Sequence, residues 1–127
     1  MAQYVYRVYV IELDPSIGLK KDFRDANVTQ VEEECFYVGY SAHSTECRWN
    51  QHQHAKTLNS VTCICDVKRG QIVNSKASAY AMKYGLWIAD KSFQLNRRPF
   101  KTTTQAKQAE RRHAELLRSE GYGVWQN

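Results

Sequence analysis

The chain has 127 residues, 43% of them hydrophobic, which is enough for one compact core and too little for two domains of ordinary size. No apolar run is long enough to cross a membrane, and Met1 to Arg7 lacks the pattern of a signal peptide, so we expect a protein of the reducing cytoplasm with no membrane partner. The formal charge of +5 and the sequence pI of about 9.1 suggest an anionic partner.

The charged residues are unevenly distributed along the chain. Residues 12–34 carry seven acidic and three basic side chains, which leaves six acidic and fifteen basic side chains, a net charge of +9, in the rest of the sequence. A basic excess of this kind is typical of a surface that binds phosphate groups.

The segment YVYRVYVIEL, Tyr4 to Leu13, is rich in β-branched and aromatic residues and predicts the first strand. Strand alternation puts Tyr9 on one face with the other odd-numbered residues. The acidic segment that follows, at about 14–34, contains Pro15 and Gly18 and has no sustained periodicity. We therefore interpret it as an elaborated connection to the next strand.

The segment CFYVGY, Cys35 to Tyr40, predicts the second strand. Gly39 interrupts this strand, and a strand glycine often marks the close approach of another group. The hydroxyl residues that follow can cap a helix from about Thr45 to Leu58. The segment VTCICDVKRG, residues 61–70, then predicts a third strand that ends in a basic turn.

The four cysteines are Cys35, Cys47, Cys63 and Cys65. A structural zinc site usually takes two closely spaced pairs of ligands, whereas only Cys63 and Cys65 are close in sequence here. We therefore expect buried free thiols, with the last two on one face of a strand.

The segment SKASAYAMKYGLWIA, Ser75 to Ala89, predicts a helix with Gly85 at its C-cap, and a basic connector at 92–101 follows it. Thr102 and Gln105 predict a capping box at the start of the last helix. The inner stripe of that helix is predicted to consist of Ala106, Ala109, His113, Leu116 and Leu117. Glu110 shares this stripe and can point inward, whereas the other candidate carboxylate, Glu115, falls on the outer side.

Gly121 is predicted to end the last helix, and the apolar tail after it is expected to pack on the sheet. The resulting order β-β-α-β-α-α predicts a single α+β domain over residues 1–127. Its centre is expected to be a small mixed or antiparallel three-stranded sheet flanked by helices.

Arg48 and His52 lie one turn apart on the helix predicted from about Thr45 to Leu58, and they therefore share a face of it. Tyr37 and Gly39 lead into the loop before that helix, so a phenol, a guanidinium and an imidazole can gather around one pocket. Arginine binds phosphate oxygens bidentately, and a phenol or an imidazole can exchange a proton with water.

The stretches VYVIEL and FYVGYS, then Arg48, His52 and TTTQAKQAERRHAELLRSEGY, occur in an order that resembles the GIY-YIG nuclease superfamily. The resemblance covers nearly the whole chain. Tyr9 matches the first half of the family name, and Tyr37 to Gly39 match the second half with valine in place of isoleucine. Arg7 and Val8 replace the first glycine and isoleucine, and the spacing from Gly39 to Arg48 is slightly longer than usual.

The resemblance implies a metal-dependent DNA endonuclease that hydrolyses phosphodiester bonds with one divalent cation, Mg²⁺ or Mn²⁺. Glu110 would be the metal ligand, and Arg48 would hold the scissile phosphate. Tyr9 would be the general base, assisted by Tyr37 or His52. Further residues are expected to contact DNA, the basic ones through its phosphates: Gly39, Ser41, Lys68, Arg69, Arg97, Arg98 and Lys101.

Each of these residues also has an ordinary structural interpretation when taken singly, because strand tyrosines pack in cores and helical charges face solvent. Two other functions therefore stay open: a catalytically silent nucleic-acid-binding module with the same fold, and a protein-interaction domain whose basic surface is incidental. A homodimer or a larger nucleic-acid-processing complex is left open as well.

Overall fold

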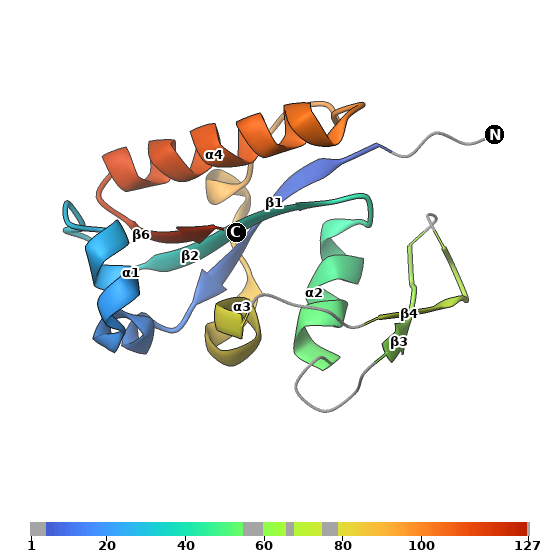
Figure 1. Ribbon diagram of the computed structural model, residues 1–127, viewed down its shortest axis with the longest axis horizontal. Helices are drawn as coiled ribbons and strands as arrows, with labels where there is room; N and C mark the ends of the chain where they lie inside the picture. The colour runs from blue at the N-terminus through green and yellow to red at the C-terminus, as the bar shows by residue number, and fades with distance from the viewer. Residues whose placement is uncertain (1–4, 55–59, 66–67, 75–78, 127) are drawn as a thin grey trace.

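The computed structural model describes residues 5–54, 60–65, 68–74 and 79–126. Its centre is a four-stranded mixed sheet in the order β5-β1-β2-β6 (Figure 1). β1 pairs antiparallel with β2 and β5, whereas β6 runs parallel to β2. The strands of this sheet are β1 (Arg7–Leu13), β2 (Cys35–Ser41), β5 (Gly85–Ile88) and β6 (Gly123–Gln126). The α+β class is confirmed, but the central sheet has four strands and not three.

Helices cover both faces of the sheet (Figure 1). One face packs against α4 (Thr103–Ser119), and the other against α1 (Lys21–Ala26), α2 (Thr45–His54) and α3 (Ala79–Tyr84). Two short 3₁₀ helices, η1 (Pro15–Leu19) and η2 (Lys91–Phe93), lie in the connections. None of the helices in the described part of the chain has the length and apolar character that a bilayer crossing requires.

The predicted alternation of β1 is confirmed. Tyr9 belongs to the core cluster on the α1–α3 side, and Val8 and Val10 belong to the cluster beneath α4. β2 divides in the same way, with Tyr37 on the first side and Val38 on the second. Because both faces are covered, both strands need apolar side chains at nearly every position, which explains their almost unbroken hydrophobic runs.

The acidic connection at 14–34 is more structured than the sequence indicated, since it contains η1 and α1 and buries Ile17 and Phe23. Asn27, just after α1, fixes this segment to β6. Its side-chain amide donates to the Val124 carbonyl at 3.0 Å, and its side-chain oxygen accepts from the Val124 N–H at 2.7 Å. The connection therefore forms part of the fold and is not an appended loop.

The helix predicted within Ser75–Ala89, with Gly85 at its C-cap, is α3, and its end at Tyr84 agrees with that cap; residues 75–78 lie outside the described residues. The next four residues form β5, which pairs with β1 and was not predicted. A short apolar run such as GLWI fits a buried strand as well as the end of a helix, so periodicity could not separate the two.

The third strand predicted at 61–70 is a small separate sheet of two antiparallel strands, β3 (Ser60–Thr62) and β4 (Ile72–Asn74). Cys63 and Cys65 follow β3 and do not lie within a strand. Gly70, with φ of +81°, occupies the left-handed region in the turn that returns to β4. The helix predicted to reach Leu58 is described as far as His54, and the remainder lies outside the described residues.

The predicted start and end of the last helix are confirmed. Thr102 Oγ1 accepts a hydrogen bond from the Gln105 N–H at 3.1 Å, and Gly121 closes the helix with φ of +95°. The inner stripe is correct except for Leu116, which is 51% exposed, and Ala114 takes a buried position in its place. The tail packs on the sheet as β6.

Candidate active site

Tyr9 lies directly across from Gly39 in the register of β1 and β2. A Cβ atom at position 39 would lie 2.6 Å from the Tyr9 hydroxyl oxygen and 3.0 Å from Cε1 of Tyr37. The Tyr9 ring therefore passes over the glycine, and the missing side chain makes room for it. The Tyr9 and Tyr37 rings pack 6.1 Å apart, centroid to centroid.

Replacing Gly39 with alanine is expected to lower the free energy of unfolding by about 1–3 kcal/mol, because the new methyl group overlaps the Tyr9 phenol. Urea unfolding provides the measurement. Gly18→Ala is the matched control, since a Cβ at that glycine meets nothing within 4 Å. Equal stability of the two variants would contradict the packing of Tyr9 over Gly39.

His52, on α2, completes the aromatic group. Its Nε2 lies 3.0 Å from the Tyr9 hydroxyl oxygen, and its ring centroid is 5.6 Å from that of Tyr37. Nδ1 of His52 is buried and has no hydrogen-bond partner among the described residues. Burial, and secondly the charge of Arg48, lower the pKa of His52 from 6.5 to about 3, so the imidazole is neutral at physiological pH.

The low pKa of His52 predicts a loss of stability in acid. Between pH 6.5 and about pH 3 the unfolded chain binds a proton at His52 and the folded chain does not, so stability falls as the pH is lowered. The contribution of His52 to the free energy of unfolding falls by up to about 1.4 kcal/mol for each pH unit. Urea unfolding across this range should show a shallower acid loss in His52→Gln than in the wild type; parallel curves would contradict the prediction.

The two phenols resist ionisation. Burial raises the pKa of Tyr9 and of Tyr37, and the positive charge of Arg48 opposes the rise in both. The negative charge of Glu110 contributes to raising the pKa of each phenol. Arg48 and Glu110 are therefore close enough to the tyrosine pair to act on its ionisation, although Tyr9 and Tyr37 themselves are at most 1% exposed.

Arg48 and Glu110 line a single cavity of about 610 Å³. The lining residues are Tyr40, Ser41, Arg48, Lys107, Glu110, Arg111 and Gln126. Arg48 comes from α2 and Glu110 from α4, on opposite faces of the sheet. Both can reach this cavity because β6 ends at Gln126 and pairs with β2 only as far as Val38. The Arg48 guanidinium donates a hydrogen bond of 2.7 Å to the side-chain oxygen of Gln51.

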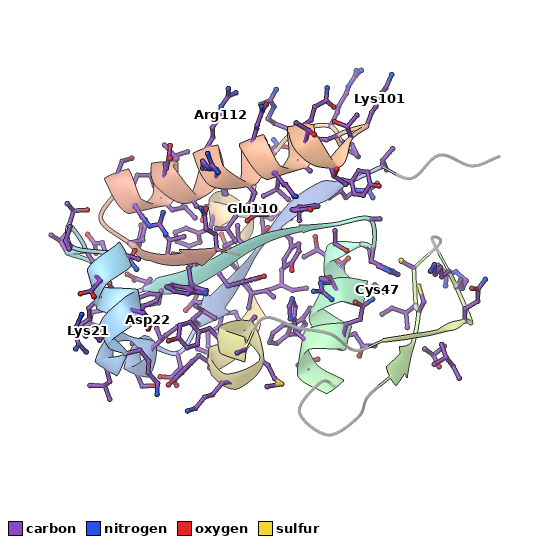
Figure 2. All side chains as sticks on the ribbon, in the orientation of Figure 1. Lys21, Asp22, Cys47, Lys101, Glu110 and Arg112 are labelled. Carbon is purple, nitrogen blue, oxygen red and sulfur yellow. The ribbon has the colours of Figure 1, made fainter. Side chains whose placement is uncertain are left out.

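Glu110 lies on the side of α4 that faces the sheet, opposite Arg112 (Figure 2). It is only 5% exposed, and its carboxylate has no hydrogen-bond or ion-pair partner among the described residues. Burial raises the pKa of Glu110 to about 7, and the charge of Lys107 opposes this rise. An unpartnered oxygen ligand beside an open cavity fits a hard divalent cation that keeps several waters.

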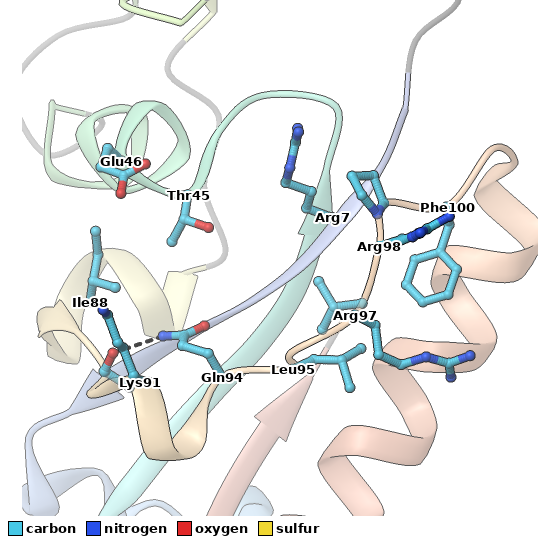
Figure 3. Close-up of a pocket in the computed structure, with 13 residues that line it drawn as sticks. Arg7, Thr45, Glu46, Ile88, Lys91, Gln94, Leu95, Arg97, Arg98 and Phe100 are labelled. Atoms are coloured by element: carbon cyan, nitrogen blue, oxygen red, sulfur yellow. Dashed lines mark hydrogen bonds between the residues drawn. The ribbon is translucent and has the colours of Figure 1, made fainter.

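Two of the predicted DNA-contacting residues, Arg97 and Arg98, line a second cavity of about 370 Å³ together with Arg7 (Figure 3). Arg7 pairs with Ser41 in the β1–β2 ladder, and Ser41 lines the first cavity. The two cavities therefore lie at the same end of the sheet.

Lys101 lies near the start of α4 and lines a third cavity that also contains Arg97 and Arg98. Lys68 and Arg69 are exposed in the turn between β3 and β4, and they line none of these three cavities. The predicted DNA-contacting cations before α4, Arg97, Arg98 and Lys101, therefore lie together. Lys68 and Arg69, in the β3–β4 turn, are not part of this group.

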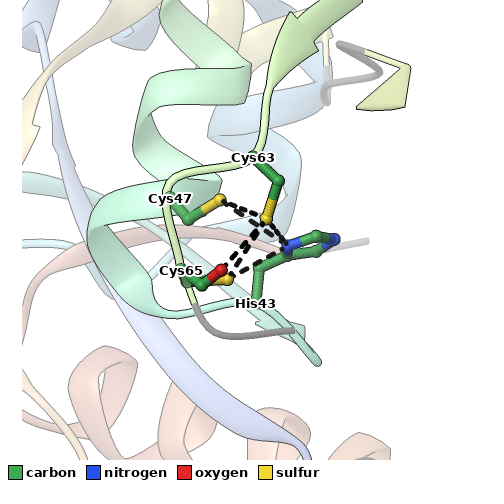
Figure 4. Close-up of side chains that lie close together, drawn as sticks. All are labelled: His43, Cys47, Cys63 and Cys65. Atoms are coloured by element: carbon green, nitrogen blue, oxygen red, sulfur yellow. Dashed lines mark hydrogen bonds between the residues drawn. The ribbon is translucent and has the colours of Figure 1, made fainter. Parts of the chain in front are cut away.

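One group of functional interest was missed at the level of sequence. The four cysteines are buried and form no disulfide, as expected, but three of them converge with His43 (Figure 4). The spacing of the cysteines alone does not indicate a four-ligand metal site. His43 and Cys47, four residues apart, form the close pair that complements Cys63 and Cys65, and this was the signal available in the sequence.

Comparison of the chain with protein-family models, with curated proteins and with solved structures found no match.

Proposed function

We propose that the protein is a metal-dependent DNA endonuclease that hydrolyses phosphodiester bonds. The observation that carries the proposal is the cavity lined by both Arg48 and the buried Glu110, whose carboxylate has no partner among the described residues. A permanent cation and a hard oxygen ligand in one cavity are what a scissile phosphate with one divalent cation requires. The resemblance of the motif residues to the GIY-YIG nucleases supports the same activity.

The substrate surface that we propose is the basic end of the sheet. It comprises seven of the nine basic residues that line the three cavities described above: Arg7, Arg48, Arg97, Arg98, Lys101, Lys107 and Arg111. These side chains come from β1, α2, the connector before α4 and α4 itself, so they can follow a phosphate backbone over a broad surface. Phosphate contacts of this kind position a duplex without specifying its sequence.

In the proposed reaction, Mg²⁺ or Mn²⁺ held by Glu110 would supply Lewis-acid stabilisation of the phosphate and of the leaving 3′ oxygen. Arg48 would hold a non-bridging oxygen and balance the charge that develops there. Water adds hydroxide to phosphorus and the P–O3′ bond breaks, leaving a 5′ phosphate and a 3′ hydroxyl. Arg48 is already oriented for its role by Gln51.

Tyr9 is our candidate general base. Its hydroxyl lies 3.0 Å from His52 Nε2, so a hydrogen bond to the imidazole can hold the phenol in position. Because burial raises the pKa of Tyr9 and lowers that of His52, the phenolate that acts as the base would have to be stabilised by the charge of Arg48 and of the bound cation. Tyr37 packs against both rings and excludes solvent from them. Tyr9 is 1% exposed and is not among the residues that line the cavity of Arg48 and Glu110, so this role requires water to reach the phenol from that cavity.

A nicking assay on supercoiled plasmid tests the proposal. The full chain should convert the plasmid to open circles with Mg²⁺ or Mn²⁺, and EDTA should stop the conversion. Glu110→Ala and Arg48→Ala should be inactive, whereas Glu115→Gln, on the exposed side of α4, should retain activity.

Two other results would identify a different function. DNA binding that weakens steeply with salt, without cleavage by any preparation, would indicate a silent nucleic-acid-binding module. The absence of both binding and cleavage would indicate a protein-interaction domain.

A further inference from the structure

We propose that His43, Cys47, Cys63 and Cys65 form a structural zinc site. His43 lies in the loop after β2, Cys47 in the first turn of α2, and Cys63 and Cys65 in the segment after β3 (Figure 4). Their ligand atoms, His43 Nδ1 and three Sγ atoms, all lie within 4.8 Å of one another. The proposal does not depend on the nuclease activity proposed above, because it concerns a different set of residues and a different kind of ion.

Five of the six distances between these atoms fit the edges of a tetrahedron around one ion, and the sixth, between the sulfur atoms of Cys47 and Cys65, is no longer than 4.8 Å. Zn–S bonds of about 2.3 Å and Zn–N bonds of about 2.0–2.1 Å imply S···S separations of about 3.8 Å and S···N separations of about 3.6 Å. Cys63 Sγ lies 3.7 Å from Cys47 Sγ and 3.6 Å from Cys65 Sγ. His43 Nδ1 lies 3.6, 3.5 and 3.4 Å from the three sulfur atoms, in chain order.

Thiol packing alone does not account for this arrangement. The S···S separations of 3.6 and 3.7 Å are far longer than the bond of about 2.05 Å in a disulfide. A single ring nitrogen lies nearly equidistant from three sulfur atoms, although an imidazole nitrogen has one hydrogen or one lone pair to share. Equal approach to three partners is the geometry of a tetrahedral vertex.

The ligand set selects the ion. Three thiolates and one imidazole suit Zn²⁺, whereas Mg²⁺ and Ca²⁺ prefer oxygen. All four positions of the tetrahedron are supplied by protein side chains, and the three cysteines are at most 8% exposed. A closed site of this kind stabilises structure and leaves no position for a substrate.

The β3–β4 hairpin needs such a stabilising contact. Among the described side chains of residues 60–74, only Cys63 and Cys65 are buried, whereas Ile64 is 48% and Ile72 is 75% exposed. An isolated two-stranded hairpin is at best marginally stable in water. The core cluster that joins the hairpin to α2 consists of Cys47, Cys63 and Cys65, so a shared metal ion explains how this segment is held.

The proposed site is also connected to Arg48. The Gln51 side chain, 3% exposed, donates through Nε2 to Cys47 Sγ at 3.7 Å and accepts through Oε1 from Arg48 at 2.7 Å. A metal-bound thiolate is a stronger acceptor than a thiol. Zinc would therefore fix the amide of Gln51 and, through it, the orientation of the Arg48 guanidinium.

Metal analysis of the full chain tests the zinc site. Protein produced in zinc-supplemented medium and dialysed extensively should retain about one zinc per chain, as a closed four-ligand site requires. Cys63→Ser and His43→Ala should lose most of this zinc. Cys35→Ser is the matched control, since Cys35 is equally buried but lies in a different core cluster, and this variant should keep the wild-type content.

Cobalt substitution of the wild-type protein gives an independent result if the ligand variants fail to fold. Co²⁺ should produce the absorption bands of a tetrahedral thiolate site, and Zn²⁺ should displace it. Wild-type protein without bound zinc and without these bands would overturn the proposal. So would iron in place of zinc, or a loss of zinc in Cys35→Ser as large as that in Cys63→Ser.

Discussion

Replacing Arg48 with alanine is expected to lower the rate of plasmid nicking about a thousandfold, which is the lower end of the range for arginines that balance transition-state charge in phosphoryl transfer. Lysine at this position should restore little of the lost rate. It keeps the charge, but it lacks the planar fork that binds phosphate in two places and that the Gln51 oxygen orients at 2.7 Å.

Single-turnover nicking rates with enzyme in excess over plasmid give the measurement, because they separate the chemical step from product release. Arg24→Lys is a suitable control. Arg24 belongs to α1 and donates to the carbonyls of Gly18 and Leu19, and it lines none of the three basic cavities. If Arg48→Ala nicks plasmid at a rate within about tenfold of the wild type, Arg48 does not stabilise the transition-state charge.

Glu110→Gln is expected to reduce cleavage at least about a hundredfold and, at the same time, to stabilise the fold at neutral pH. Burial raises the pKa of Glu110 to about 7. The folded protein therefore holds this proton more tightly than the unfolded chain, and the stability contributed by the residue is lost as the pH rises from about 4.5 through 7. Glutamine does not ionise, so above pH 7 the free energy of unfolding of the variant should exceed that of the wild type by about 1–3 kcal/mol.

The two effects of Glu110→Gln are measured separately. Urea unfolding below and above the raised pKa should show a stability gain that grows with pH, and adding Mg²⁺ should stabilise the wild type and not the variant. Glu115→Gln, which is exposed, should change neither stability nor cleavage. A Glu110→Gln protein that cleaves normally would exclude the carboxylate as a metal ligand.

The sequence predicted the parts of the site that depend on local pattern. β-strand alternation placed Tyr9 on one face of β1 with the other odd-numbered residues, and the helical period placed Arg48 and His52 on one side of α2, where His52 does contact Tyr9. Helical periodicity also turned Glu110 inward on α4. These expectations succeeded because each needs only the geometry of one regular element.

What the sequence did not predict depends on contacts between distant segments. β5 was not predicted because its pairing with β1 supplies the backbone partners that a short apolar run lacks by itself. The His43 cluster was missed because its ligands come from three segments that only the folded chain brings together. The shared cavity of Arg48 and Glu110 likewise depends on where β6 stops, and no local pattern encodes that point.

The position of Gln126 affects how the protein should be handled in the laboratory. This residue ends β6 and also lines the cavity of Arg48 and Glu110. An affinity tag or fluorescent protein attached within a residue or two of Gln126 would therefore begin beside that cavity and compete with a bulky polyanion for access. A polyhistidine tail there would in addition bring its own imidazoles to the divalent ion, so activity measurements call for a cleavable tag or an untagged chain.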